Sequence, residues 1–167
     1  VLGRGHRTEL PRHQTLRAAI DWSYDLLTEP ERRLLRRLSV FVGSFTLEAA
    51  EDVAAGGVAE GAGVVDILSQ LIDKSLVQVT DRDGTNLRYR LLETVRQYGR
   101  ERLSDAREAD ALERRHADHY LSVLETAAPL LVGGSNSMEH VERLAREHDN
   151  VRVALSWAVS DASRAEH

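Results

Sequence analysis

The pattern that most constrains the fold is a β-hairpin signal that leads directly into a helix. A β-rich run at 76–80 and a second run at 87–91 flank an Asp83-Gly84 turn. Apolar residues alternate with arginines in the second run, which indicates a half-buried strand. The residues from 93 onward read as a helix. A hairpin followed at once by a helix leaves few architectures open.

Helical periodicity precedes this hairpin. The spacing of apolar residues predicts helices at 15–27, 30–39, 46–53 and 64–73. Three helices, a hairpin and another helix are the winged-helix pattern. We therefore expect a mostly α protein whose main part is a winged helix, with a three-helix core and a β-hairpin wing.

The character of the chain changes beyond Leu103. Apolar spacing predicts a long helix at 109–127, which Pro129 and the residues at 133–136 break, and a second helical stripe at 141–159. Helical hairpins of this length are the unit of TPR-like solenoids, although no internal repeat is visible. This stripe would be left uncovered in isolation, so we expect the helical segment to dock on the winged helix. The predicted parts are a linker at 1–12, a winged-helix domain at 13–103 and a truncated TPR-like α-helical segment at 104–167.

The composition fits a globular protein in water. Hydrophobic residues make up 42% of the chain and charged residues 29%. No apolar run approaches the ~20 residues that span a bilayer, and no export leader is evident. The chain has no cysteine, which is compatible with a reducing compartment. We expect a cytoplasmic protein with no membrane contact, and the start at Val1 rather than Met fits an excised piece of a longer protein.

The net charge of −5 is distributed unevenly. Residues 1–45 hold eight arginines against five acids, and the remainder holds 14 basic against 22 acidic residues. An acidic surface repels phosphate backbones, which argues against nucleic-acid binding. Four arginines of the predicted helix 30–39 fall opposite its leucines, and we expect them to form a solvated face. They are Arg32, Arg33, Arg36 and Arg37.

No motif of enzyme chemistry is present. Lys74 lacks the glycines of a phosphate-binding loop, so we expect no catalytic residue and no ATP binding by this chain itself. His116 and His119 are three residues apart but have no third ligand in register, and packing of His116 on its helix is the better interpretation. The carboxylates around the start of the long helix lie among arginines and indicate solvated ion pairs. These are Asp105, Glu108, Asp110 and Glu113.

Winged helices often bind DNA through their third main helix, which corresponds to 64–73 here. Its non-apolar positions are Asp66, Ser69, Gln70 and Asp73, with only Lys74 trailing. Phosphate contact and guanine readout both require arginine or lysine. The predicted wing turn at 81–84 is also acidic. This pattern argues against direct DNA binding.

Five segments of the chain occur in the order of a known family: Pro11–Leu27, Arg37–Phe41, Phe45–Ala50, Tyr89–Tyr98 and Glu147–Arg152. Together they resemble the region that follows the nucleotide-binding core in bacterial STAND ATPases of the NB-ARC type. The resemblance implies an upstream P-loop ATPase core, then a winged helix, then a helical-repeat sensor. Such proteins are often LuxR-type or SARP-type transcriptional regulators. The linker at 1–12 would then follow the absent core, and ATP or ADP would bind in the parent protein rather than here.

The resemblance also implies a nucleotide-sensing position. In relatives a Met-His-Asp motif of the winged helix carries a histidine that contacts the β-phosphate of ADP. The matching residues here are Leu91, Leu92 and Glu93. Leu92 cannot donate a hydrogen bond, whereas Glu93 can keep the role of the acidic residue. The alternative is a core leucine followed by a carboxylate favoured at a helix N-terminus.

Two functional interpretations follow. The first is a non-catalytic regulatory module, which couples the nucleotide state of the P-loop core to effector or partner engagement. Its partners would be that core and proteins that contact the helical segment. The alternative is a DNA-binding winged-helix transcription factor. An enzyme without a known motif is a weaker third class.

Overall fold

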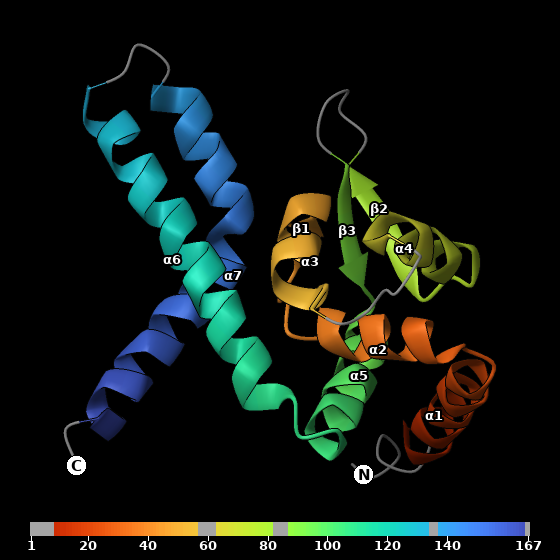
Figure 1. Ribbon diagram of the computed structural model, residues 1–167. Coiled ribbons are helices and arrows are strands. Elements are labelled where there is room, and N and C mark those ends of the chain that lie inside the picture. The colour runs from red at the N-terminus through yellow and green to blue at the C-terminus, as the bar shows by residue number, and fades with distance from the viewer. Residues whose placement is uncertain (1–8, 57–62, 82–86, 134–136, 166–167) are drawn as a thin grey trace, which may run out of the picture.

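The computed structural model describes residues 9–56, 63–81, 87–133 and 137–165. These residues form seven helices and a small three-stranded sheet (Figure 1). In chain order the elements are α1 (Glu9–Asp25), α2 (Glu29–Leu38), β1 (Ser44–Thr46), α3 (Leu47–Ala54), α4 (Val64–Asp73), β2 (Val77–Asp81), β3 (Arg88–Leu91), α5 (Glu93–Asp105), α6 (Ala109–Gly133) and α7 (Ser137–Ala165). No helix in the described residues is long and apolar enough to cross a membrane.

The sheet has the strand order β1-β3-β2, and both pairings are antiparallel. Tyr89 in the central strand lies opposite Phe45 on one side and Val79 on the other. The hairpin β2–β3 confirms the predicted strands, while its turn at 82–86 lies outside the described residues. β1 was not predicted, because its three residues become a strand only by pairing with β3, more than 40 residues away.

The order helix, strand, two helices and two strands is that of a winged helix, as predicted. α2, α3 and α4 pack with the sheet around one apolar core. Its fully buried members include Leu34, Leu35, Leu38, Phe41, Phe45, Val53, Leu68 and Leu71. Phe41 and Phe45 stack with ring centroids 4.6 Å apart, a geometry that adds to the stabilisation from burial.

Local signals explain where these helices begin. The hydroxyl of Thr46 accepts a hydrogen bond from the amide of Ala49 at 3.1 Å, which caps α3 as predicted. α5 crosses α2 closely at Gly99, where a Cβ atom would lie 2.8 Å from the Cβ of Ser39. A larger residue at position 99 would force Ser39 or the helices to shift, so glycine permits the close α2–α5 approach here.

α1 begins at Glu9, so the last four residues of the expected linker at 1–12 are helical, and the division into parts stays a prediction. The helix packs along α5 through an aromatic contact and an ion pair. Tyr24 meets Tyr98 edge-on at 5.3 Å, and Arg17 pairs with Glu101 at 2.5 Å. The segment before Thr15 has no apolar period, and helix continuation from the neighbouring turns overrides that weak signal.

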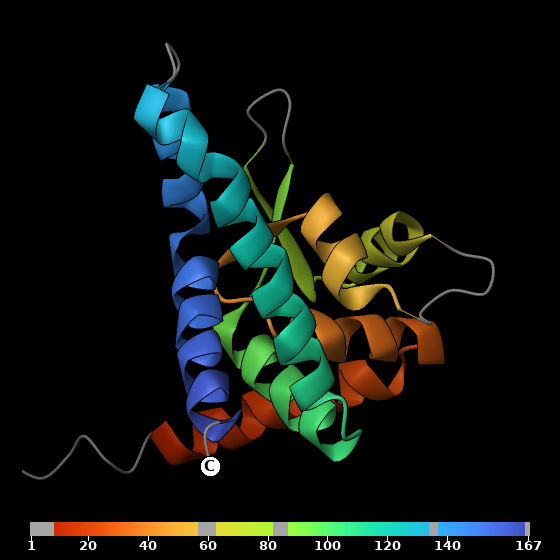
Figure 2. The same ribbon diagram turned by 60° about the vertical axis from the view of Figure 1, so that its left-hand side comes forward.

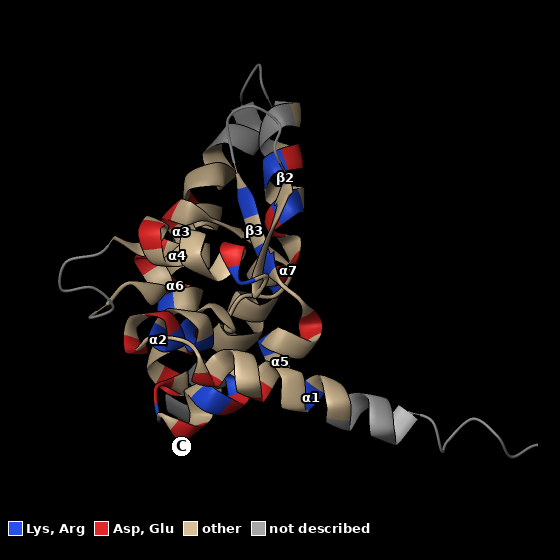
Figure 3. Ribbon diagram, turned by 90° about the vertical axis from the view of Figure 1, so that its right-hand side faces the viewer, with Lys and Arg blue, Asp and Glu red and all other residues tan. Residues whose placement is uncertain are grey.

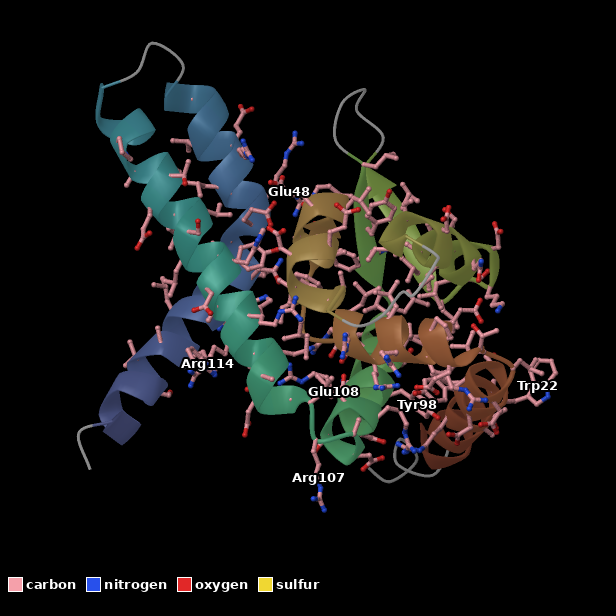
Figure 4. All side chains as sticks on the ribbon, in the orientation of Figure 1. Trp22, Glu48, Tyr98, Arg107, Glu108 and Arg114 are labelled. Carbon is pink, nitrogen blue, oxygen red and sulfur yellow. The ribbon has the colours of Figure 1, made fainter. Side chains whose placement is uncertain are left out.

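The arginines of α2 contradict the expectation of a solvated face. The side chains of Arg36 and Arg37 are only 11% exposed, and both pair with Glu108 in the turn between α5 and α6. Arg37 also donates to the carbonyl of Ala54, and Arg32 donates to the carbonyl of Tyr24. α2 lies in the middle of the molecule, so neighbouring chain covers its polar face as well (Figures 1 and 4). Glu108, expected in a solvated pair, is half-buried here.

α6 and α7 form an antiparallel hairpin beside the winged helix (Figures 1 and 2). α6 continues past Pro129 to Gly133, so the predicted break at the proline is wrong. Pro129 is exposed, and water can serve the carbonyl that loses its helical partner. α6 packs on α3 and α7 contacts β1, in agreement with the expected docking of the helical segment.

Candidate functional site

The exposed face of α4 is the first candidate site, because winged helices place this helix in the major groove of DNA. Its core-facing residues are buried as predicted. The exposed positions are Val65, Asp66, Ser69, Gln70, Asp73 and Lys74. This face therefore offers carboxylates where DNA presents phosphates. Figure 3 shows lysine and arginine on α2 and β3, interspersed with acidic segments.

Lys74, the cation that follows α4 directly, has a partner inside the protein. Lys74 Nζ lies 2.5 Å from Glu31 Oε1, and the Glu31 side chain is only 2% exposed. Glu31 Oε2 also accepts hydrogen bonds from the amide of Thr28 at 2.7 Å and its hydroxyl at 3.0 Å. Burial alone would raise the pKa of Glu31, but Lys74 and Thr28 together lower it. A phosphate would have to compete with this carboxylate for Lys74.

A shallow groove of about 590 Å³ lies between the end of α4 and the hairpin. Its lining includes Ser75, Gln78, Thr80 and Arg90. Arg90 is exposed, and its guanidinium lies 3.3 Å from the Gln78 side-chain oxygen. Arg90 is thus a cation beside α4 that has no acidic partner among the described side chains.

The predicted nucleotide-sensing residues lie where β3 meets α5. Leu92 is the residue before α5 and is 41% exposed, so the alternative interpretation as a core leucine is wrong. Glu93 occupies the first turn, as that interpretation expected. Its carboxylate accepts two hydrogen bonds from Arg96, both at 2.8 Å, and one from Gln97 at 3.0 Å. The Arg96 contact lowers the pKa of Glu93. Sensing of nucleotide at Leu92 and Glu93 stays a prediction.

A buried polar group joins the winged helix to the α6–α7 hairpin. We call it the junction cluster, and it consists of Ser44, Arg88, His116, Glu147 and Asn150. Arg88 forms an ion pair with Glu147, with side chains 7% and 10% exposed. Arg88 also donates to the Ser44 hydroxyl at 2.9 Å and the Ser44 carbonyl at 3.1 Å. These bonds connect β3, β1 and α7 at one point.

Asn150 links the same elements through its amide. Its Oδ1 accepts from the backbone amide of Val42 at 2.8 Å, and its Nδ2 donates to the carbonyl of Ser44 at 2.9 Å. His116 Nε2 lies 3.2 Å from the same Oδ1, so this nitrogen carries the proton. Burial lowers the pKa of His116 to about 4. The ring is therefore neutral near pH 7.

The packing role expected for His116 is confirmed, since it is 1% exposed and its ring lies edge-on to Phe41 and tilted against Tyr120. His119 instead contacts Asp52 at 3.0 Å. No group of three or more potential ligands in the described part of the chain is placed to hold a metal ion.

Sequence reasoning missed the junction cluster. Strand alternation assigned Arg88 to the exposed side, whereas it is 5% exposed. A signal was available in the segment 147–152, where Glu147 and Asn150 are three residues apart and so share one helical face. Both are buried, while His148 and Asp149 between them are exposed.

Comparison with known proteins identifies the first part of the chain. Residues 27–104 match the winged helix-turn-helix domain family. Proteins of Mycobacterium tuberculosis (strain H37Rv) and Mycobacterium bovis carry the provisional name HTH-type transcriptional regulator. Each is 47% identical over 159 residues, which is 95% of this chain but 18% of the relative. An uncharacterized M. tuberculosis protein is 45% identical over 107 residues, covering 64% of this chain and 27% of that protein. No solved structure matches.

These matches confirm the winged helix and relate the chain to transcriptional regulators. The names mention neither a nucleotide-switch ATPase nor a TPR-like repeat, so both parts of the resemblance stay predictions. The domain-family match and the names of the relatives favour the DNA-binding alternative over the nucleotide-switch interpretation.

Proposed function

We propose, from the premise that residues 27–104 form a winged helix-turn-helix domain, that this chain is a non-catalytic module of a longer transcriptional regulator. In that role α4 contacts protein rather than DNA. The observation that carries the proposal is the α4 face, where Asp66 and Asp73 are exposed and Lys74 pairs with the buried Glu31. Transfer of Lys74 to a phosphate would leave that carboxylate buried without its cation, which disfavours a phosphate contact through Lys74.

The junction cluster supports a role in transmission between parts of the regulator. It fixes the α6–α7 hairpin against β1 and β3 through charged and polar contacts that are buried. A partner that binds the hairpin would therefore act on the winged helix as well. Coupling to a P-loop core, with nucleotide sensing at Leu92 and Glu93, rests on the family resemblance alone.

Direct DNA binding is the second candidate function. The winged helix-turn-helix match and the names of the mycobacterial relatives favour it. Arg90, exposed beside α4, could contact a phosphate. Asp66 and Asp73 oppose it, since carboxylates in the groove would face phosphate oxygens.

Fluorescence anisotropy with a random pool of 30-base-pair duplexes separates the two candidates. At 50 and 200 mM salt we expect binding no tighter than a Kd of about 10⁻⁴ M. The double variant Asp66→Lys/Asp73→Lys should bind measurably tighter, which shows that the assay detects α4. A submicromolar Kd for the unaltered chain that rises steeply with salt and weakens in Arg90→Gln would establish the DNA-binding alternative.

Titration calorimetry tests whether the chain itself takes nucleotide. We expect no heat of binding from ATP with magnesium, because no phosphate-binding loop is present. A Kd in the low micromolar range, about −8 kcal/mol, would contradict this expectation. The result would not bear on the α4 face, which the DNA experiment addresses separately.

A further inference from the structure

A cleft of about 750 Å³ lies between α5, α6 and α7, away from the α4 face. The side chains that matter for its chemistry are Arg100, Asp110, Glu113, Arg114, Arg152 and Trp157. They come from the winged helix and from both helices of the hairpin. Pockets that bind small molecules have volumes of about 300–1,000 Å³ and combine apolar walls with a few polar groups.

The charges in this cleft leave an excess of arginine, although the chain as a whole carries −5. Arg100 and Glu113 neutralise one another, with 2.6 Å between the guanidinium and the carboxylate. Of the other charged residues in the lining, Arg114 and Arg152 are cationic and Asp110 is anionic. Among the described residues, no hydrogen bond or ion pair engages Arg152. An anion that enters the cleft would meet a guanidinium that is not already paired with a carboxylate in the described residues.

An aromatic ring lines the same cleft. The Arg114 guanidinium lies over the Trp157 ring, 5.7 Å from its centroid. Figure 4 shows Arg114 on the side of α6 that faces the C-terminal half of α7. Trp157 is only partly buried against the core. An indole ring with a guanidinium over it offers an aromatic surface beside a positive charge, which suits a planar anion.

We propose that this cleft binds a small planar organic anion, such as an aromatic carboxylate or phosphate. Arg152 and Arg114 bind the anionic group, and the ring of the ligand lies against Trp157. A ligand here contacts α5, α6 and α7 together. It therefore strengthens the attachment of the hairpin to the winged helix.

The two tryptophans of the chain provide an internal control. Trp157 lines the cleft, whereas Trp22 on α1 is 68% exposed and points away from the body of the protein (Figure 4). In ¹H–¹⁵N spectra each indole N–H gives one resonance. We expect titration with 2-naphthoate, and separately with 1-naphthyl phosphate, to shift the Trp157 resonance in a saturable manner and to leave Trp22 unchanged.

The probes distinguish charge from stacking. Neutral 2-naphthamide should bind at least 10-fold more weakly than 2-naphthoate if the arginines recognise the anion. Inorganic phosphate should shift the Trp157 resonance only weakly, because it has no ring to stack. Equal affinity for naphthoate and naphthamide, or parallel shifts of Trp22 and Trp157, would overturn the proposal.

Charge variants give the sign of the electrostatic effect. Arg152→Gln and Arg114→Gln should each weaken naphthoate binding at least fivefold, and Asp110→Asn should tighten it about twofold or more. Arg143→Gln removes an exposed arginine from α7 outside the cleft and is the matched control. An equal loss in Arg143→Gln would show that the probes respond to the general charge of the protein rather than to this cleft. Weaker binding in Asp110→Asn would contradict competition between Asp110 and the anion. Either result would overturn the proposal.

Discussion

At the scale of single residues, Arg107 has a backbone conformation that its side chain disfavours. Its φ is 57°, in the left-handed region, at the end of α5. The amide of Glu108 donates to the carbonyl of Leu103 at 3.2 Å across this turn. Such positions after a helix are usually glycine. The exposed Arg107 side chain points into solvent (Figure 4), so no contact offsets the strain.

We therefore expect Arg107→Gly to stabilise the protein by roughly 0.5–1 kcal/mol, since relief of the left-handed strain exceeds the added entropy of the unfolded chain. The free energy of unfolding in urea measures this. Arg107→Ala removes the same charge but keeps the strain, so it should give no gain. An equal gain for alanine and glycine would rule out the backbone explanation.

His116 predicts a pH dependence of stability. Its pKa is about 4 in the folded protein and about 6.5 when unfolded, so the unfolded chain takes up the proton first. The stabilisation is complete above pH 6.5 and is lost as the pH falls towards 4. Between pH 6.5 and 5 we expect a loss of about 1.5 kcal/mol from this residue.

The variant His116→Gln keeps a hydrogen-bond donor towards Asn150 but does not titrate. Its urea unfolding free energy should fall by about 1.5 kcal/mol less than that of the unaltered chain over the same range. Above pH 5 most carboxylates stay ionised in both states, so they contribute little to the comparison. Parallel pH profiles for the two proteins would contradict the assignment to His116.

The sequence predicted the burial of individual residues well where the periodicity of one helix or hairpin determines which side chains face the core. It failed where distant chain covers a residue, because periodicity describes only the element itself. Arg88 is buried by Glu147, which lies 59 positions further along. The reverse holds for Leu92, which the alternative to nucleotide sensing placed in the core and which is 41% exposed.

At the scale of elements, the third prediction concerns the Arg88–Glu147 ion pair that joins β3 to α7. Glu147→Met leaves Arg88 buried without its partner and should cost about 3–5 kcal/mol of unfolding free energy. The double variant Arg88→Met/Glu147→Met should cost clearly less than the two single changes combined. A double-mutant cycle by urea unfolding measures this coupling.

The exposed pair Arg17–Glu101 between α1 and α5 is the matched control. Its side chains are 53% and 46% exposed, so water and salt screen their attraction. The corresponding Met cycle should give a coupling energy of less than about 1 kcal/mol. If the two cycles gave the same coupling, burial of the Arg88–Glu147 pair would not explain its contribution.

Element boundaries were predicted best where the apolar periodicity is regular or a side-chain cap is present. α4 spans the predicted residues 64–73, and Thr46 caps α3. β1 could not be predicted, since pairing with a distant strand rather than local propensity defines it. The continuation of α6 through Pro129 depends on exposure of that turn, which a single sequence does not encode.

At the scale of the whole molecule, the fourth prediction concerns the dependence of the hairpin on the winged helix. Leu112, Tyr120 and Ala154 are buried in the full chain, in the same core cluster as the winged-helix residues. In a fragment of 104–167 they would lose that cover, each large side chain forgoing roughly 1.5–3 kcal/mol. We expect the fragment to show no cooperative thermal transition at the melting temperature of the full chain.

Thermal unfolding of 1–103, 104–167 and the full chain, followed by circular dichroism, makes this comparison. Cooperative melting of 104–167 at the temperature of the full chain would mean that the two parts are independent. Lower stability of 1–103 than of the full chain is also expected, because Arg88 loses Glu147 in that fragment.

The molecular architecture was largely predictable, and the candidate sites were not. The alternation of helices and hairpin determined the winged helix, and the uncovered stripe of the second part indicated docking. The charge pattern of α4 was predictable from the sequence, but the pairing of Lys74 with Glu31 was not. Neither was the cleft between α5, α6 and α7, since three separate elements build it.

The pairing of Lys74 has a consequence for covalent labelling. Lys74 is the sole lysine of the chain, so an acylating reagent has a single side-chain amine to attack. The resulting amide carries no charge, and the Glu31 carboxylate, already bonded to Thr28 at the start of α2, loses its cation. Acylation of this protein is therefore a targeted disruption of the contact between α2 and α4 rather than a neutral tag.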